Sequence, residues 1–406
     1  MNMYLSFSIQ TTASIKDERK LNVASFCSVF ALIVQMLLYA LIGSQGWVHV
    51  LALSIAAIPL LLSLPVWFKR NIALPITSYV TVMLVFISHF ILFKENRQYL
   101  TEYLFQFVFM CLPTFINMSL KRDDKIEFKF LILFSFLIFA IGMIYSFLIL
   151  MKIINWGSHS YNMSFSYYML IPSLLFIHMS IKRKSLFYAL VAILSFVSIV
   201  LLGSRAPIVF CFIFFVVDVF ISCKTILVKI VWLFVFAALY FLFDSIVNSL
   251  QSAFASFGLT SRSLSYFVSG EFLSSGGRNE ITSKSIDMIL EKPVFGNGIG
   301  SDLASIGQYT HNLFLDIFLH YGLMVGGLIA IFICYLVLFA FFRSNNKSVF
   351  LIFFCAGFLP SLVSGTYLSS VFLWLFLGYC FRHLKINRVI GFKNSNTYHN
   401  IPVISR

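Results

Sequence analysis

Long apolar runs separated by short polar segments fill nearly the whole of this 406-residue chain. Many are close to the ~20 residues that a helix needs to cross a bilayer. A helix is the expected conformation, because an isolated strand in lipid would leave its backbone groups unpaired. The pattern predicts about twelve transmembrane helices, at residues 22–43, 46–67, 74–93, 101–119, 127–151, 161–180, 185–202, 206–222, 225–243, 312–342, 348–364 and 366–381. We therefore expect an all-α integral membrane protein.

Composition agrees with this fold class. Hydrophobic residues make up 60% of the chain and charged residues 11%, whereas a soluble domain is about one quarter charged. The seven cysteines lie within or beside apolar runs and form no CxxC pair, so we expect small buried hydrophobes rather than disulfides or metal ligands. The net charge of +14 comes from clusters between the runs, a pattern typical of membrane topology and not of nucleic-acid binding.

The positions of the cations predict the orientation. With the N-terminus in the cytoplasm, 21 of the 29 lysines and arginines fall on the inner side, as the positive-inside rule requires. An even number of spans puts the C-terminus on the same side. The predicted regions are a cytoplasmic N-terminus (1–21), nine spans (22–243), a large outer loop (244–311), three spans (312–381) and a cytoplasmic tail (382–406).

The outer loop between the ninth and tenth spans is the only long connection in the predicted topology, and such loops are more often functional than not. Residues 244–259 place four apolar side chains at helical spacing, which predicts a helix on the membrane surface. These side chains are Ile246, Leu250, Phe254 and Phe257. A second helix is predicted over 278–291, after Gly276–Gly277 and before Pro293. A disordered spacer is the alternative.

Two arginines on the predicted outer side are candidates for binding an anion. Arg205 lies in the Gly203-Ser204-Arg205 turn between two apolar helices, and Arg278 opens the predicted helix after Gly277. A guanidinium beside free helix N–H groups suits a phosphate. The alternatives stay open: Arg205 as a snorkelling anchor, and Arg278 as a solvated loop cation.

A polar stripe begins the tenth span. His311 precedes Asn312, Asp316 and His320, which are spaced i, i+4, i+8 and share one helical face. The span is about ten residues longer than a bilayer needs, so we expect the stripe at the outer membrane surface, as a wetted helix end or as a histidine that serves an anionic substrate. Since no acidic pair or His/Asp cluster has metal-ligand spacing, we predict metal-independent chemistry.

Few charges fall near the middle of a predicted span. His178 and Asp218 lie near span ends, where we expect them to be interfacial. An ion-coupled transporter normally carries ionisable groups near the membrane midplane, so this pattern counts against transport.

Two stretches resemble the O-antigen polymerase and ligase family. One is Leu202-Gly203-Ser204-Arg205-Ala206. The other runs from Gly277-Arg278-Asn279 through Ile289–Gly300 to His311-Asn312 and Tyr321-Gly322-Leu323. The span count and the place of the large loop match the family as well.

The resemblance implies a GT-C-like, inverting, metal-independent membrane glycosyltransferase without a cofactor, in the bacterial inner membrane. Its donor would be an oligosaccharide on a polyprenyl diphosphate, such as undecaprenyl diphosphate, and transfer would occur at the periplasmic face. The implied catalytic residues are Arg205, Arg278 and His311. The implied substrate-binding residues are Ser204, Gly277, Asn279, Asn312 and Asp316. His311 would assist the acceptor hydroxyl or bind the diphosphate; a chain-length regulator and a flippase are the expected protein partners.

Within the family, the motifs favour a polymerase over a ligase. Ligases carry a Gly-x-x-Gly pair nine residues after His-Asn, but here Val325 stands at the second glycine position and Gly326 follows. The Phe295–Gly300 run resembles polymerases more closely. A flippase of lipid-linked sugars and a scaffold or sensor are the rivals from other functional classes.

Overall fold

The computed structural model describes residues 14–43, 46–120, 122–154, 162–223, 225–256, 258, 261–271 and 278–384. Within this part of the chain every regular element is a helix, so the predicted all-α class is confirmed. Eight described helices, or runs of consecutive helices, are long and apolar enough to cross a membrane, and four apolar helical segments are shorter. The chain is a multi-pass membrane protein.

The N-terminal half supplies six predicted spans. They correspond to α1 (Ile15–Ile42), α2 (Gly46–Asn71), α3 (Ala73–Leu92), the run α4–η2–α5 (Arg97–Gln106, Phe107–Cys111, Leu112–Ser119), α6 (Asp124–Leu150) and α7–α8 (Met163–Tyr168, Leu170–Arg183). A 3-10 turn, η1 (Lys94–Asn96), precedes α4, and η2 is π-helical. The first helix begins seven residues before the predicted start, because Ser14 caps it and Asp17 and Glu18 occupy its first turn.

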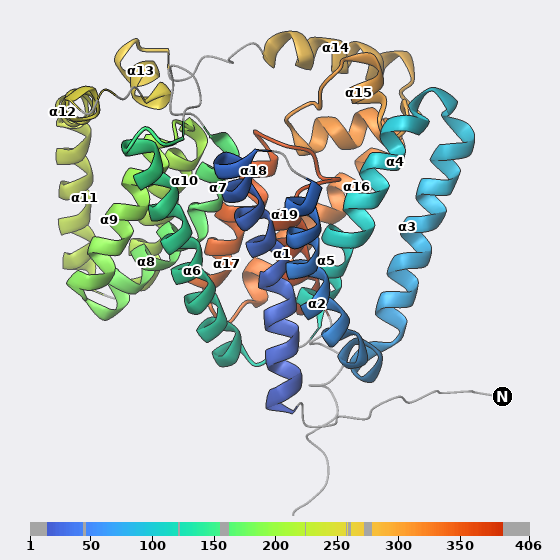
Figure 1. Cartoon of the computed structure of the whole chain (residues 1–406), viewed down its shortest axis with the longest axis horizontal. Coiled ribbons are helices and arrows are strands. Elements are labelled where there is room, and N and C mark those ends of the chain that lie inside the picture. The colour runs from blue at the N-terminus through green and yellow to red at the C-terminus, as the bar shows by residue number, and fades with distance from the viewer. Residues whose placement is uncertain are drawn as a thin grey trace, which may run out of the picture.

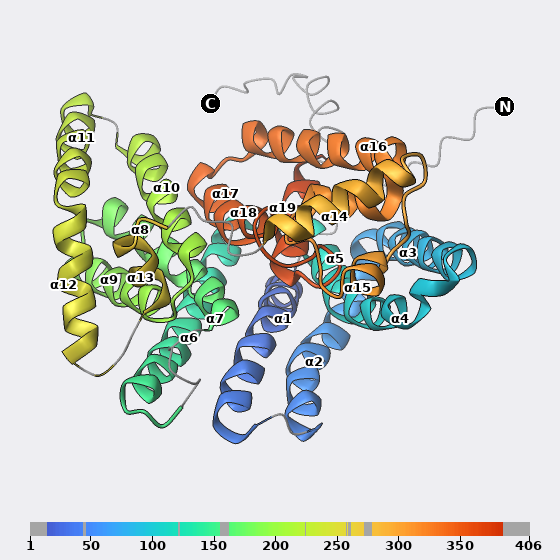
Figure 2. The ribbon, with the colours of Figure 1, turned by 90° about the horizontal axis from the view of Figure 1, so that it is seen from above.

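The C-terminal half supplies the other six. They correspond to α9 (Leu186–Leu201), α10 (Arg205–Ser222), α11 (Ile226–Phe241), α16 (Leu313–Arg343), the run α17–η3–α18 (Lys347–Phe353, Phe354–Phe358, Leu359–Ser361) and α19 (Val371–Leu384). The last span begins at Val371 rather than 366, because residues 362–370 form a turn-rich loop around Gly365, which has a φ of 76°. In the bundle, α19 packs against both α5 and α16 (Figures 1 and 2).

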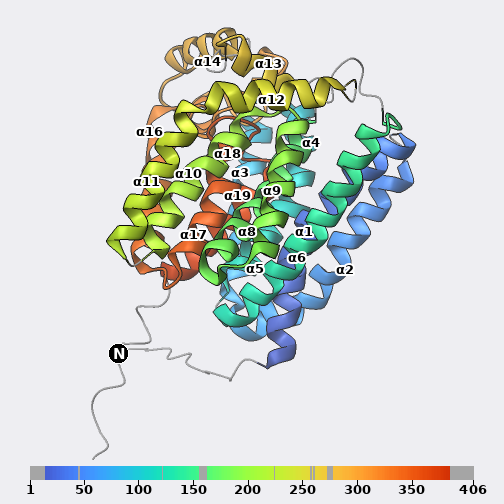
Figure 3. The same cartoon turned by 90° about the vertical axis from the view of Figure 1, so that its left-hand side faces the viewer.

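Four helices of the predicted outer loop gather at one end of the bundle (Figure 1). They are α12 (Phe243–Ser256), α13 (Arg262–Val268), α14 (Arg278–Glu291) and α15 (Ser301–Ser305). The predicted boundaries of α14 agree with the structure, whereas α13 and α15 were not predicted. Helix α12 runs across the spans (Figure 3) and buries Val247 and Phe254 with Val200 and Leu264. Its apolar side therefore packs on protein, although Ile246 stays exposed and Phe257 lies outside the described residues.

Buried ion pairs tie the helices together at the opposite end. Arg382 pairs with Glu127 at 2.9 Å, and Arg70 pairs with Glu18 at 2.7 Å. His178 and Asp218 form a buried pair at 3.0 Å between α8 and α10, so the expectation that these two residues are interfacial was wrong. A carboxylate beside an imidazole tolerates burial that neither group would tolerate alone.

Helix α16 is broken at Gly322, whose φ of 75° and ψ of 177° are not helical. The break frees backbone groups in the outer part of the helix, and residues 293–298 bind them. Asn297 N–H donates to Leu319 O at 2.8 Å, Gly298 N–H to His320 O at 3.1 Å, and Leu323 N–H to Pro293 O at 2.6 Å. The glycines let the two backbones touch, since a Cβ at Gly322 would collide with Val294 and one at Gly296 with Gly322.

Gly322→Ala is expected to destabilise the protein, because it adds both left-handed strain and a collision with the Val294 carbonyl. Strain of this kind costs about 1–3 kcal/mol, so thermal unfolding in detergent should shift to lower temperature. Gly327→Ala is the matched control, since nothing lies within 4 Å of a Cβ at that helical position. Equal melting temperatures for the two variants would contradict this account of the break.

Candidate active site

The outer loop returns to the bundle at Arg278. This residue opens α14, and its guanidinium Nη1 donates to the backbone oxygen of Val363, in the loop that follows α18. Helix α14 packs over α16 (Figure 2). The cation predicted at a helix start is thus fixed over the membrane bundle and is not a freely solvated loop side chain.

His311 lies beside Arg278, just before α16. Its φ of 62° is left-handed, a conformation that a non-glycine residue holds only under constraint. Its ring lies 4.3 Å from the Tyr309 ring, and its Nδ1 is buried without a hydrogen-bond partner in the described structure. Burial, reinforced by the charge of Arg278, lowers the pKa of His311 from 6.5 to about 4. The imidazole is therefore neutral at physiological pH.

Asn312 holds this histidine in place. Its side-chain oxygen caps α16 by accepting from Phe314 N–H at 3.0 Å and Leu315 N–H at 3.1 Å. Its Nδ2 donates to Leu362 O at 3.1 Å, next to the oxygen that binds Arg278. The loop at residues 362–363 thus joins Arg278 to the start of α16, and the side chain of Asn312, which was predicted to bind substrate, forms hydrogen bonds within the protein.

Arg205 occupies a different cluster. It begins α10, directly after the buried Ser204, its guanidinium lies 4.3 Å from the centre of the Tyr266 ring, and it donates to Glu271 O at 3.0 Å. Arg262 also lies over that ring, at 5.5 Å. Neither Tyr266 nor Arg262 was predicted from the sequence as a site residue. The joint catalytic role that the resemblance implies for Arg205, Arg278 and His311 stays a prediction, and the contacts given for Arg205 are those with Tyr266 and Glu271.

The remaining predicted site residues at α14 differ in position. Asn279 is exposed in the first turn of α14. Gly277 lies outside the described residues. The first turn also carries Glu280, which pairs with Lys284 at 2.8 Å, so an anion at this helix start would meet a carboxylate that is already neutralised.

The polar stripe of α16 is not a wetted helix end. Asp316 and His320 are both 0% exposed. Thr310 Oγ donates to Asp316 Oδ1 at 2.6 Å, and His320 contacts Asp302 of α15 at 3.3 Å and Tyr367 at 3.0 Å. The loop at residues 293–298 covers this part of the helix, which is why residues expected at the membrane surface are buried.

Asp302 completes a group that sequence spacing could not reveal. Asp302, Asp316 and His320 bring three potential metal-ligand atoms within 4.8 Å of one another. Tyr103 of α4 donates to the other Asp302 oxygen at 3.2 Å. The expectation that no His/Asp cluster has metal-ligand geometry is therefore corrected: the third ligand comes from a separate short helix, 14 residues before Asp316. The nearest sequence signal was Asp302 in the turn after Gly300.

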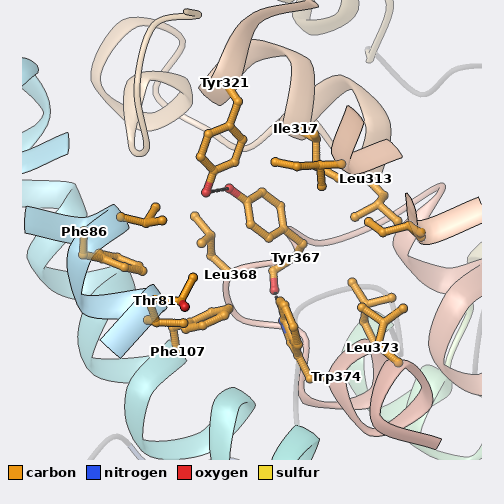
Figure 4. Close-up of a pocket in the computed structure, with 15 residues that line it drawn as sticks. Thr81, Phe86, Phe107, Leu313, Ile317, Tyr321, Tyr367, Leu368, Leu373 and Trp374 are labelled. Atoms are coloured by element: carbon orange, nitrogen blue, oxygen red, sulfur yellow. Dashed lines mark hydrogen bonds between the residues drawn. The ribbon is translucent and has the colours of Figure 1, made fainter. Parts of the chain in front are cut away.

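An apolar cavity of about 200 Å³ adjoins this polar network (Figure 4). Helices α3, α16 and α19, together with η2 and the 367–368 loop, line it. Tyr321 and Tyr367 form one wall, and their hydroxyls are 3.3 Å apart. The cavity exceeds the ~150 Å³ apolar cavity that admits benzene in a well-studied soluble protein, so it has room for part of a hydrocarbon chain.

Residues 190–330 match the family model described as O-antigen ligase. The match covers about one third of the chain, and this segment is similar to the O-antigen ligase family. The family resemblance expected from the sequence is thereby confirmed, and it supports a membrane glycan-transfer function in O-antigen biosynthesis. No curated protein and no solved structure matches the chain.

The O-antigen ligase segment runs from α9 into α16 and contains Arg205, Arg278 and His311. The rest of the site comes from outside it. Tyr103, the oxygens of Leu362 and Val363, and the α3 and α19 walls of the cavity all lie beyond residues 190–330. The candidate site is therefore built by the whole bundle, with the family segment supplying its charged and imidazole groups.

Stability should depend on His311 between pH 6.5 and pH 4. Below pH 6.5 the unfolded chain binds a proton at this histidine, while the folded protein does not until about pH 4, so acidification favours unfolding in that window. His311→Gln should therefore lose less melting temperature than the wild type between these two pH values. Arg278→Gln should narrow this pH range, because it removes a charge that lowers the pKa of His311. Lys284 is an exposed cation on the same helix, and Lys284→Gln should leave the range unchanged. If the melting temperatures of the wild type and His311→Gln change with pH in the same way, the lowered pKa of His311 is contradicted.

Proposed function

We propose that this protein is a glycosyltransferase that moves an oligosaccharide from a polyprenyl diphosphate to a second lipid-linked repeat unit at the periplasmic face of the inner membrane. In this proposal it is an O-antigen polymerase. The observation that carries the proposal is a neutral His311 within the electrostatic influence of Arg278 at the loop-bearing end of a membrane bundle. A ligase that transfers the glycan to lipid A-core is the second candidate.

Arg278 suits the leaving group. As the glycosidic bond to the diphosphate breaks, negative charge grows on the phosphate oxygens, and a guanidinium supplies permanent, planar hydrogen-bond donors for them. Its anchor on the Val363 carbonyl fixes its position before the substrate arrives. Fixed donors stabilise a developing charge without reorganising during the reaction.

His311 suits the acceptor. Its neutral imidazole accepts the proton of the acceptor hydroxyl as that oxygen forms the new bond to the sugar C1 and the diphosphate departs from the opposite side. The configuration at C1 inverts. Because Arg278 helps to lower the pKa of His311, a bound diphosphate that offsets this positive charge raises that pKa. The histidine is then a stronger base only when the donor is present, and the reacting groups include no metal ion.

The apolar cavity suits the lipid chain of the donor. Its walls carry almost only hydrocarbon, and it adjoins the outer half of α16, whose start holds His311. A polyprenyl chain in the cavity would keep its diphosphate near the outer end of the bundle. Arg205 and Arg262, whose guanidinium groups both lie over the Tyr266 ring, offer a second cationic and aromatic surface for glycan or phosphate of the other substrate.

The choice of polymerase over ligase rests on sequence motifs. In the structure, Gly326 packs against the backbone of Ile317, where a side chain would be tight, while Val325 is 41% exposed. The one-residue displacement of this glycine relative to the ligase pattern thus has a local packing reason. The Phe295–Gly300 run has one too, because Gly296 and Gly298 pass close to α16 and Phe93.

Deletion and complementation in a strain with long surface polysaccharide tests the function. Arg278→Gln and His311→Gln should each lower transfer about 100-fold or more, as expected for lost charge stabilisation or base catalysis, and Lys284→Gln should restore normal chains. A polymerase defect leaves single repeat units on the lipid core, a ligase defect leaves long chains on the polyprenyl carrier, and a flippase defect leaves nothing attached.

The site assignment fails if Arg278→Gln and His311→Gln both give normal chain lengths at normal protein levels. Long chains on the carrier would replace the polymerase proposal with the ligase. An unmodified lipid core, with lipid-linked repeats trapped inside, would favour the flippase.

Filling the cavity should weaken use of long-chain donors. Ile333→Trp places a large ring among the lining residues, and displacing a few CH₂ groups at about 0.8 kcal/mol each should raise KM about tenfold. Ile331→Trp is the matched control, because Ile331 is 68% exposed on the same helix. In reconstituted vesicles, a donor with a short isoprenoid tail should be much less affected. Equal loss in both variants, or with both donors, would remove the cavity from the proposal.

A further inference from the structure

The buried cluster behind the candidate site has the composition of a cation site. Asp302, Asp316 and His320 are each 0% exposed, and their ligand atoms all lie within 4.8 Å of one another. They come from two elements, the short helix α15 and the outer segment of α16. Two carboxylates and one imidazole are common ligands for divalent ions of the first transition row.

The two carboxylates of the cluster face at most one protein cation, the imidazole of His320. Within the described part of the chain, neither carboxylate forms an ion pair with a lysine or arginine, and Asp302 pairs only with His320. Two ionised carboxylates in this interior would be costly without a counter-charge. A divalent ion with a neutral imidazole would balance both.

Asp316 supplies an independent indication. Its Oδ1 accepts a hydrogen bond from Thr310, whereas its buried Oδ2 has no partner with hydrogen-bond geometry in the described structure, although the Thr366 hydroxyl lies close enough to interact with the carboxylate. Buried polar atoms almost always have a partner, and an exception points to a bound water or ion. The Thr310 and Tyr103 hydroxyls beside the two carboxylates, at 2.6 Å and 3.2 Å, offer further oxygen ligands after small rotations.

We propose that Asp302, Asp316 and His320 bind one divalent cation of the Mn²⁺ or Zn²⁺ class. The ion is structural: it fastens α15 to the outer segment of α16, beneath the loop at residues 293–298. Through Asp316 and Thr310 it also steadies the backbone next to His311. The cation does not touch the transferred sugar, and its binding does not depend on the proposed glycosyl transfer.

The test uses the full-length protein purified in detergent. Mass spectrometry of the metals should find about one Mn²⁺ or Zn²⁺ per chain. Removal by a chelator should lower the melting temperature, and added Mn²⁺ should restore it and give the electron paramagnetic resonance spectrum of a bound ion. Asp316→Asn and His320→Gln should each weaken Mn²⁺ binding by about tenfold or more.

Asp218→Asn is the matched control. Asp218 is equally buried and also pairs with a histidine, His178, at 3.0 Å, but the metal-ligand group found in the described structure does not include it. This variant should keep the metal even if it loses stability. If a ligand variant fails to fold, the proposal is tested by titrating Mn²⁺ into wild-type protein from which the chelator has removed the metal.

The proposal is overturned if the wild type binds no stoichiometric ion and the chelator leaves its melting temperature unchanged. The cluster would then be a hydrogen-bonded network that shares a proton. Because metal content and melting temperature are measured without any sugar substrate, this outcome is separate from a failure of the glycosyltransferase function.

Discussion

The end of the bundle that carries α12 to α15 depends on the break in α16 at Gly322. A helix inside a membrane protein satisfies its own backbone groups, and a break exposes them where no water is available. Residues 293–298 supply the missing partners, with Asn297 and Gly298 donating to α16 and Pro293 accepting from it. The same hydrogen bonds fix the return path of the outer loop. The end of α14 is thereby held close to α16, while the loop at residues 362–363 binds Arg278 at the start of α14 and Asn312 next to His311.

Two different environments lie near this junction. On one side is an apolar cavity whose wall includes Tyr321 and Tyr367, and on the other are Arg278 and His311. The buried group of Asp302, Asp316 and His320 adjoins the cavity through the hydrogen bond of His320 to Tyr367. At Asp302, burial opposes ionisation, but the hydrogen bond and charge of His320 outweigh it and hold the pKa of the carboxyl below its ordinary value. The polar layer can therefore carry charge next to hydrocarbon.

The family segment and the rest of the bundle contribute differently. Residues 190–330 provide the charged side chains, but the oxygens that orient Arg278 and Asn312 belong to the loop between α18 and α19. The side chains of Arg278 and Asn312 are oriented by the backbone carbonyls of Val363 and Leu362, which lie far along the chain. The matched segment therefore supplies the charged loop, while helices outside residues 190–330 form part of its surroundings.

The sequence by itself determined the helical class, the apolar runs that became spans, and the boundaries of α14, because hydrophobic length and helix punctuation are local properties. It also singled out Arg278 and His311, which the structure joins through one loop. Only the tertiary structure decided that Arg205 stacks on Tyr266, that Asp316 and His320 are buried, and that Asp302 joins them. These contacts depend on how residues 293–298 pack across the break in α16 at Gly322. A local sequence pattern does not predict which backbone groups meet there.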